Sequence, residues 1–492
     1  GSSSGVAASA AHRAMQKTRG ALISLGFWAT LLGLCFCSGI RRAHVDIALS
    51  RPPAIHATPW RAKQVGLCRR SNVRVLTRRT AKDSKWDSVP FAPGPWAVPV
   101  LGSLSVIWAL LVRRVPLQEI LRDLRAKYGP LFLIRTGPVS QVWVGDHAML
   151  RRVYGTPECC GRPASFKDPF GDFLFLTKEP GLAAVIKERQ KAWLDANLSE
   201  AAVCAAVDEA VPRLWSSLDT NRPQPWPAEA VRHSMYSVVT CALLGKDGLM
   251  ADSELVEFMA ATKEYSEMRG KSKFGKKGGG EPEPPPGARR IKEIILKSLK
   301  RAGWCDFDEA LPLVVSASIG GAEIFPTLLH WIFLFFAREP ERQEVAARAA
   351  VRGDSGALMR ELYAVLRRTT YSVALGPPRK ILADVQVEGY RLPADALLFA
   401  MHPAIVDEAL GTEPSADDDF ASYAFGVGPR ACLGQRLAEA LLPATVGAML
   451  RRYRVSHRDP VAASVALEGE LRGQLIHPVD PPPICWELRE AK

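Results

Sequence analysis

A segment of 33 residues, 306–338, carries apolar side chains on almost every side of a helix. Such a segment suits a helix that is buried through the middle of a large domain. Its centre, SIGGAEIFPT at 318–327, holds an acid, paired glycines and a proline, and the glycines and the proline make it a poor helix-forming stretch. A local exception of this kind often marks a functional site. We therefore expect a central buried helix with a site near its midpoint.

The rest of the chain is dominated by helical periodicity. Its 492 residues, 47% hydrophobic and 23% charged, can bury a large core and exclude disordered and fibrous classes, and ten cysteines are too few for a disulfide scaffold. An insert at 275–290 is expected to be an exposed loop. The fold class is mainly α with a minor β-sheet. Helices are predicted at 117–127, 181–204, 227–244, 253–268, 291–302, 306–338, 341–351, 357–371 and 435–453, and strands at 131–135, 141–144, 385–387 with 391–392, and 397–399.

An uncharged run of 21 residues, 20–40, follows an N-terminal tail of residues 1–19 and lies between Arg19 and the Arg41–Arg42 pair. As a helix it would be about 32 Å long, enough to cross a hydrocarbon core of about 30 Å. We expect a membrane anchor here. The alternatives are a cleaved signal segment and a buried core helix, although the run is longer than an ordinary signal core.

Most of the net charge of +13 comes from residues 1–90, which hold 15 Lys and Arg against three acids, whereas the remainder holds 49 against 48. This distribution does not favour a nucleic-acid partner, which would need a basic folded face. Residues 41–90 are predicted to be a basic, disordered linker. The positive-inside rule then places the C-terminal body on the cytoplasmic side, and the endoplasmic reticulum is the membrane we expect. If the segment is cleaved, the two stretches would form a two-part leader to a plastid or other organelle.

The segment 425–439 (FGVGPRACLGQRLAE) presents a cysteine in a glycine-rich loop directly before a predicted helix. Free N–H groups and the dipole at a helix N-terminus stabilise negative charge, so Cys432 gains thiolate character there. Gly426, Gly428 and Gly434 let the backbone turn sharply and approach a flat ligand closely. For any of the other nine cysteines a structural role is the better expectation.

This loop resembles the haem-binding signature of the cytochrome P450 superfamily. All six positions of that signature match: Phe425, Gly426, Gly428, Arg430, Cys432 and Gly434. The resemblance extends over most of residues 91–490, with a proline-rich hinge at 90–102, KYGPLFLIRTG at 127–137 and an Arg162-Pro163 pair. It implies the cytochrome P450 fold, with residues 91–492 as the haem domain.

The resemblance also implies roles for individual residues. Cys432 would be the proximal thiolate ligand of haem iron, which favours O–O cleavage by pushing electron density onto the metal. Phe425 would pack beside the sulfur and keep it dry. Taken singly, each arginine of the pattern would be a surface charge, but in register with the cysteine loop three of them are expected to neutralise the haem propionates: Arg189, Arg379 and Arg430.

The central helix departs from the family's pattern of a small residue, Gly, any residue, an acid and Thr. Here the acid is Glu323, and Ile324 stands where the threonine belongs. In a monooxygenase the acid and the alcohol together help to deliver protons to the oxygen being reduced. Glu323 is therefore the candidate catalytic residue, and it would keep the acid half of this proton relay. The alternative is that Glu323 is only a polar residue held by the packing of the helix.

A second departure lies in the helix that normally carries Glu, two residues and Arg. Arg367 keeps the arginine position, but Ala364 replaces the glutamate, and the segment 402–425 is short. We expect Arg367 to reach water or another acid, because a buried arginine without a counter-charge costs several kcal/mol. The shortening also reduces the face on which electron donors dock in this family, and a faulty gene model would have the same effect.

Three functions remain open. The first is a monooxygenase that inserts one oxygen atom of O₂ into an apolar small molecule, with electrons from a reductase or ferredoxin. The second is a haem-thiolate isomerase or dehydratase that acts on a substrate peroxide without reductase, which Ile324 and the reduced docking face favour and the unextended cysteine loop disfavours. The third is a degenerate, non-catalytic haem-binding relative.

Overall fold

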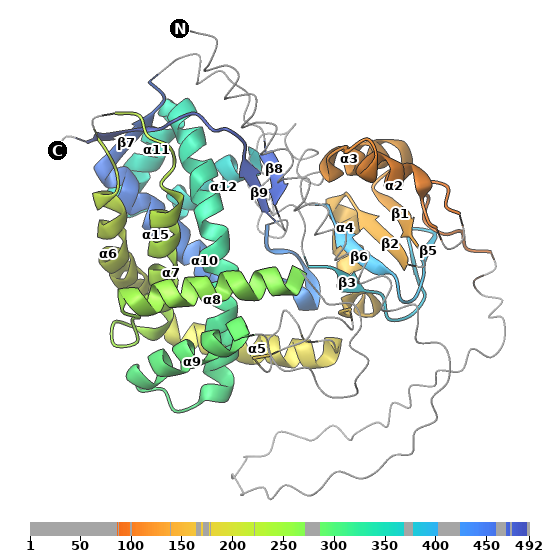
Figure 1. The fold of residues 1–492 in the computed structure, drawn as a ribbon, viewed down its shortest axis with the longest axis horizontal. Helices are drawn as coiled ribbons and strands as arrows, with labels where there is room; N and C mark the ends of the chain where they lie inside the picture. Colours follow the sequence, from red (N-terminus) through yellow and green to blue (C-terminus); the bar gives the residue numbers. More distant parts are fainter. Residues whose placement is uncertain are drawn as a thin grey trace, which may run out of the picture.

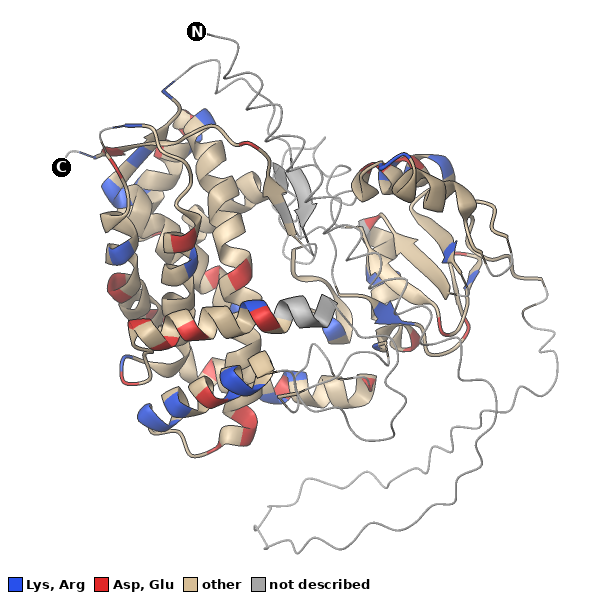
Figure 2. Ribbon diagram, in the orientation of Figure 1, with Lys and Arg blue, Asp and Glu red and all other residues tan. Residues whose placement is uncertain are grey.

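The computed structural model describes residues 86–489 except 87, 99–100, 138, 164–168, 171–176, 178, 221, 271–285, 369–376, 402–423, 459–468 and 473–474. Figure 1 shows a large helical part gathered around a long central helix and a smaller part built on a sheet. Figure 2 shows acidic and basic residues interspersed along the helices, and their numbers beyond residue 90 are nearly equal.

The described helices confirm the mainly α fold class. The chain order is α2 (Leu104–Leu111), α3 (Leu117–Tyr128), α4 (His147–Gly155), the 3-10 helix η2 (Pro157–Cys160), α5 (Pro180–Asn197), α6 (Glu200–Ser216), α7 (Ala228–Leu244), α8 (Asp252–Gly270), α9 (Pro286–Arg301), α10 (Phe307–Arg338), α11 (Pro340–Val351), α12 (Ser355–Arg368), the 3-10 helix η3 (Gly428–Arg430) and α15 (Gln435–Arg452).

The main sheet has the strand order β1-β2-β6-β3, with bounds Leu131–Thr136, Val139–Val144, Leu397–Ala400 and Arg379–Lys380. β1 and β2 form an antiparallel hairpin, β6 runs parallel to β2, and β3 is antiparallel to β6. Three further strand pairs are antiparallel: β4 (Val385–Val387) with β5 (Tyr390–Leu392), β7 (Tyr453–Ser456) with β10 (Cys485–Leu488), and β8 (Gly469–Arg472) with β9 (Leu475–Pro478). The minor sheet content is as expected, and β7 to β10 were not anticipated.

The central helix α10 is continuous over 32 residues despite Pro312, Pro326 and the glycine pair at its centre. Its length and composition would suit a membrane span, but half of its most apolar window is buried inside the protein. It packs against α7, α9 and α12, and its buried side chains belong to the main hydrophobic core. The expectation of a buried central helix is confirmed, because packing on several sides outweighs the low local helix propensity.

Two boundaries differ most from the sequence-based expectation, and α2, α4 and β3 were not predicted at all. The helix expected over 181–204 is two helices, α5 and α6, because Leu198 and Ser199 take extended backbone angles. The Ser199 hydroxyl accepts a hydrogen bond from the Ala202 N–H at 3.1 Å and caps α6. In the insert, residues 286–290 are not loop but the first turn of α9, which begins at Pro286. Proline is favoured there because its missing N–H would have no partner in the first turn.

We expect Ser199→Ala to lower the free energy of unfolding by about 1 kcal/mol, because the first turn of α6 loses its side-chain acceptor. Urea unfolding followed by circular dichroism measures this change. Ser216→Ala at the other end of α6 is the control, because the Ser216 hydroxyl only donates to the Arg213 carbonyl of its own helix. An equal loss in both variants would contradict the capping role.

Several sequence-based expectations fall on residues outside the described part. These are the anchor at 20–40, most of the linker at 41–90, the insert at 275–285, the end of the helix at 369–371, and the short segment 402–423. The backbone of α12 includes Arg367, but its side chain is outside the described part as well.

Candidate functional site

The cysteine loop lies where the helical part meets the sheet part. The 3-10 helix η3 within the loop packs against α5 on one side and α4 on the other. Leu433 packs on Ala183 and Ile186 of α5. The Cys432 N–H donates to the carbonyl of Phe425 at 2.7 Å, which closes the loop just before α15 begins. Cys432 therefore sits three residues before Gln435, the first residue of a helix of 18 residues.

Glycine is required at two positions of this loop. Gly426 and Gly428 have φ values of 73° and 75°, in the left-handed region that side chains rarely adopt. A Cβ added to Gly428 would also lie 2.5 Å from the Tyr154 carbonyl oxygen of α4. Gly434 is less constrained, since an added Cβ would be 3.7 Å from the Cys432 sulfur, an ordinary contact. The first two glycines thus allow the sharp turn and the close approach to α4.

The Cys432 side chain has exposed surface, yet protein lies densely around it. Both observations hold for a sulfur that lines a recess. Desolvation raises the pKa of the thiol, while the Gly434 N–H, the Lys187 ammonium and the Gln435 N–H oppose that rise. These three groups lessen the rise, but the pKa of the free thiol still lies above its ordinary value, against the thiolate character expected from the sequence. The thiolate is the form that binds a metal.

Three buried guanidinium groups come together beside the loop: Arg162, Arg379 and Arg430. Arg379 of β3 donates to the carbonyls of Tyr154 at 3.0 Å and Val427 at 3.1 Å, and lies over the Tyr154 ring at 3.6 Å. Arg430 donates to the Cys160 carbonyl at 3.0 Å. Arg162 reaches the carbonyls of Pro377 and Pro378, next to Arg379, at 3.1 and 3.0 Å. We call these three residues the arginine cluster.

The arginine cluster is electrostatically costly. Burial, with repulsion from Arg430 and Arg379, lowers the pKa of Arg162 to about 9. Burial and repulsion from Arg379 lower the pKa of Arg430 to about 10. Burial also lowers the pKa of Arg379. Guanidinium groups held this close together suit a ligand with more than one negative charge, such as the two propionates of a haem.

The structure does not bring Arg189 to the arginine cluster. Its Nε lies 3.1 Å from Glu309 Oε1 of α10. The α5 residue that reaches the loop is Lys187, whose ammonium donates to the Gly428 carbonyl at 3.3 Å. The two residues are two positions apart in a helix and so point about 200° apart. Lys187 was missed by sequence reasoning, as was the place of Arg162 in the cluster; the role expected for Arg189 stays a prediction.

Glu323 is held by two residues of α7. Its Oε1 accepts a hydrogen bond from Tyr236 at 2.5 Å and pairs with the Arg232 guanidinium. Desolvation and the Glu323 charge raise the pKa of Tyr236, so its hydroxyl stays a donor. Among the described residues none donates to Oε2, which is thus free to hold water. Sequence reasoning did not find these partners, because nothing local links α7 to α10.

The middle of α10 is open on one side. Gly320 is exposed although the helix runs through the core, and an added Cβ there would meet no described atom within 4 Å. Ile324, one turn further on, is half-buried. A cysteine and a polycationic cluster beside the same loop suit a flat, dianionic metal porphyrin, so the residues present fit a haem.

α12 is tied to its neighbours despite its departure from the family's pattern. Glu361, one turn before Ala364, pairs with Arg342 of α11 at 2.9 Å. The Tyr363 hydroxyl donates to Glu439 of α15 at 2.7 Å. Desolvation and the Glu439 contact raise the pKa of Tyr363, so the phenol keeps its proton. These contacts join the helix that follows the cysteine loop to the helix that lacks the usual glutamate.

Comparisons with known proteins agree on one family. A 20-oxo-5-O-mycaminosyltylactone 23-monooxygenase of Streptomyces fradiae is 34% identical over 120 residues, 23% of this chain and 28% of the relative. A mitochondrial cholesterol side-chain cleavage enzyme of Hypanus americanus is 25% identical over 189 residues, 34% of this chain and 37% of the relative. The matched segments thus span about a third of each relative.

A zebra fish cytochrome P450, solved with progesterone, has a similar fold. The TM-score is 0.59 at 16% identity, and the match covers 76% of this chain and all of that one. This likeness shows the fold alone. The model of the family described as cytochrome P450 matches residues 93–275 and 306–478. These two stretches make up more than half of the chain, which therefore belongs to the cytochrome P450 family.

Proposed function

We propose that this protein is a haem-thiolate monooxygenase that inserts one oxygen atom of O₂ into an apolar small molecule, with electrons from a reductase or ferredoxin. The observation that carries the proposal is the recessed Cys432 before α15, next to the arginine cluster. Both curated relatives described above match only in part, and the name of one contains the word monooxygenase.

Several residues of this chain would together hold the cofactor, each in a different way. Cys432 would ligate the iron, and Phe425, half-buried in the same loop, would limit water at the sulfur. Arg379 and Arg430 would neutralise the propionates together with Arg162. Gly426, Gly428 and Gly434 would keep the loop close to the macrocycle. When bound, haem would supply the activation of oxygen, as thiolate-ligated iron does.

Proton supply would rest on Glu323. Its Oε1 is fixed by Tyr236 and Arg232, which leaves Oε2 to hold a water that passes a proton toward the substrate side of α10. Ile324 offers no hydroxyl to continue this route. A nearby alternative donor is Thr327, whose hydroxyl lies 3.5 Å from His477 Nδ1 of β9. Proton delivery would therefore limit the amount of product formed per reductant consumed.

We expect Ile324→Thr to raise the product formed per reductant consumed by about an order of magnitude, somewhat below the effect of one positioned proton-transfer group. The measurement is reductant oxidation against product formation in a reconstituted system, with Leu328→Thr, one turn further along α10, as control. If the protein instead rearranges a substrate peroxide, turnover will need peroxide rather than reductant, and Ile324→Thr will leave it unchanged or lower it. Unimproved coupling in a reductant-dependent enzyme would point to Thr327 as the working donor.

We further propose that the protein is attached to a membrane, in the endoplasmic reticulum with its body facing the cytoplasm. The support in the described residues is an apolar surface on and before α2, where Trp96, Leu101, Trp108 and Val112 are 77%, 57%, 59% and 55% exposed. Arg113 and Arg114 follow this surface directly and suit anionic lipid headgroups. Large aromatic side chains are favoured at such an interface.

The full-length protein should stay in the membrane pellet after carbonate and high-salt washing, because a spanning anchor resists both. Removal of residues 1–90 should leave a near-neutral protein that still binds haem. Release of the full-length protein by either wash would favour the organelle-processed, unanchored form.

A further inference from the structure

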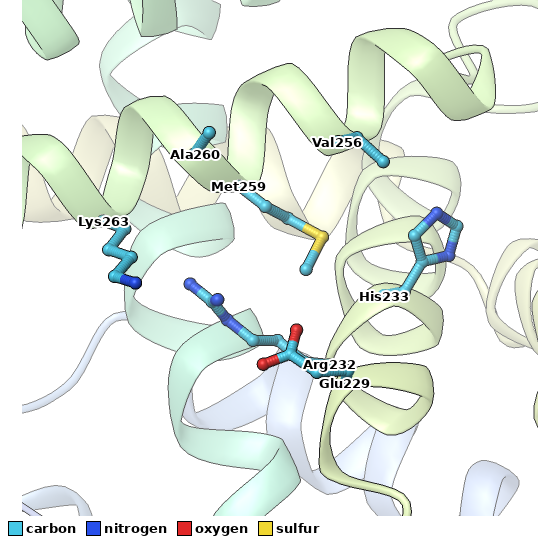
Figure 3. A pocket seen from close by; sticks show the side chains of 7 residues that line it. All are labelled: Glu229, Arg232, His233, Val256, Met259, Ala260 and Lys263. Carbon is cyan, nitrogen blue, oxygen red and sulfur yellow. The ribbon is translucent and has the colours of Figure 1, made fainter.

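A pocket of about 300 Å³ lies between α7 and α8, on residues that do not belong to the cysteine loop. This volume is at the lower end of the range for small-molecule sites. Figure 3 shows the side chains that line it: Glu229, Arg232, His233, Val256, Met259, Ala260 and Lys263.

Two cations meet at one end of this pocket. Lys263 of α8 and Arg232 of α7 point toward one another (Figure 3). Arg232 gives its Nε and Nη2 to Glu323, which leaves Nη1 without a hydrogen bond among the described residues. Lys263 likewise makes no ion pair or hydrogen bond with a described residue. Facing cations repel each other, so an anion placed between them is stabilised by both.

The rest of the lining limits the size, shape and charge of that anion. Met259 lies in the middle of the pocket, and Val256 lies beyond it, next to His233 (Figure 3). A methionine thioether adapts its shape to apolar groups and makes favourable contacts with aromatic rings. Glu229 lies beside Arg232, and Glu323 pairs with the same guanidinium, so the ligand would be held by the remaining donor of Arg232 and by Lys263 rather than by a net positive lining.

We propose that this pocket binds a small monocarboxylate with an apolar body. The carboxylate lies between Arg232 Nη1 and Lys263 Nζ, and the body lies against Met259. The site is separate from the cysteine loop and does not depend on the proposed haem chemistry. The pocket nevertheless adjoins the proposed proton route through one side chain, because the Arg232 guanidinium that receives the ligand also fixes Glu323.

The test uses the full chain with ¹³C-methyl-labelled methionine and 3-phenylpropanoate as the probe. The Met259 methyl signal, one of nine, is assigned by its loss in Met259→Leu. We expect a saturable shift of this signal. Lys263→Met should weaken the apparent affinity about fivefold, the effect of one partly exposed ion pair, and Glu229→Gln should strengthen it about twofold. Lys300→Met on α9, which is outside the lining, is the matched control and should leave the affinity unchanged.

Four results would overturn the proposal. One is the absence of a shift at Met259. The second is a shift with equal affinity for 3-phenylpropanol, which has the same body without the charge. The third is a shift that Lys263→Met and Lys300→Met weaken equally, since that would reflect net charge rather than this pocket. The fourth is probe binding in another apolar cavity, which would shift the methyl signals of other methionines with an affinity that Lys263→Met leaves unchanged.

Discussion

Cys432→Ser should abolish the thiolate-type band in the reduced carbon-monoxide difference spectrum. The band requires a deprotonated sulfur on the iron, and a serine hydroxyl is neither soft nor ionised at neutral pH. Cys432 is the described cysteine that lies in the recess before α15, where the Gly434 and Gln435 backbone N–H groups donate to its sulfur and the Lys187 charge is near. We expect complete loss of the band rather than partial loss.

Two cysteines serve as matched controls. Cys204 is exposed on α6, as Cys432 is exposed in its loop, and Cys204→Ser should leave the band intact. Cys159 is fully buried in η2, next to the residue whose carbonyl binds Arg430, and burial and the adjacent Cys160 raise the pKa of its thiol to about 12. Cys159 lies in η2 and not in the loop before α15, so Cys159→Ala should also keep the band. Retention of the band in Cys432→Ser, or its loss in either control, would refute the assignment of the ligand.

Arg379→Met should weaken haem binding by about two orders of magnitude, since leaving a buried charge unpaired costs about 3 kcal/mol. Arg379 is 3% exposed, so in the variant water could not reach this position to stabilise the negative charge of the propionate. The rate of haem transfer to an excess of apoglobin measures this loss. Arg189→Met is the comparison, because Arg189 pairs with Glu309 and should lose far less.

The haem-free protein gives a second readout for the arginine cluster. Removing one of three mutually repelling guanidinium groups relieves repulsion but also removes the hydrogen bonds of Arg379 to Tyr154 and Val427. These effects oppose each other, so thermal unfolding of the haem-free variant should change much less than that of the haem-loaded one. Equal destabilisation of both forms would mean that Arg379 has a structural role only.

The sequence by itself determined the central helix, the mainly α fold and the cysteine loop. Each is local: the apolar residues of 306–338 lie within one helix, and the glycines that permit the turn at 426 and 428 stand beside Cys432. It also indicated the family, whose model matches residues 93–275 and 306–478. The break at Ser199 was missed because one extended residue pair is a weak signal within a long helical pattern.

The resemblance already assigned Arg379 and Arg430 to one site, but only the tertiary structure decided which other charged groups meet. Arg162, Arg379 and Arg430 come from η2, β3 and η3, or from the residues next to them, and converge because the sheet part packs against the loop. Arg232 and Glu323 are 91 positions apart and pair because α7 lies along α10. Lys187 rather than Arg189 contacts the loop because of the way α5 is rotated about its axis. Ion pairs and hydrogen bonds act over a few ångströms, so they depend on packing between distant segments, which no local pattern in the chain encodes.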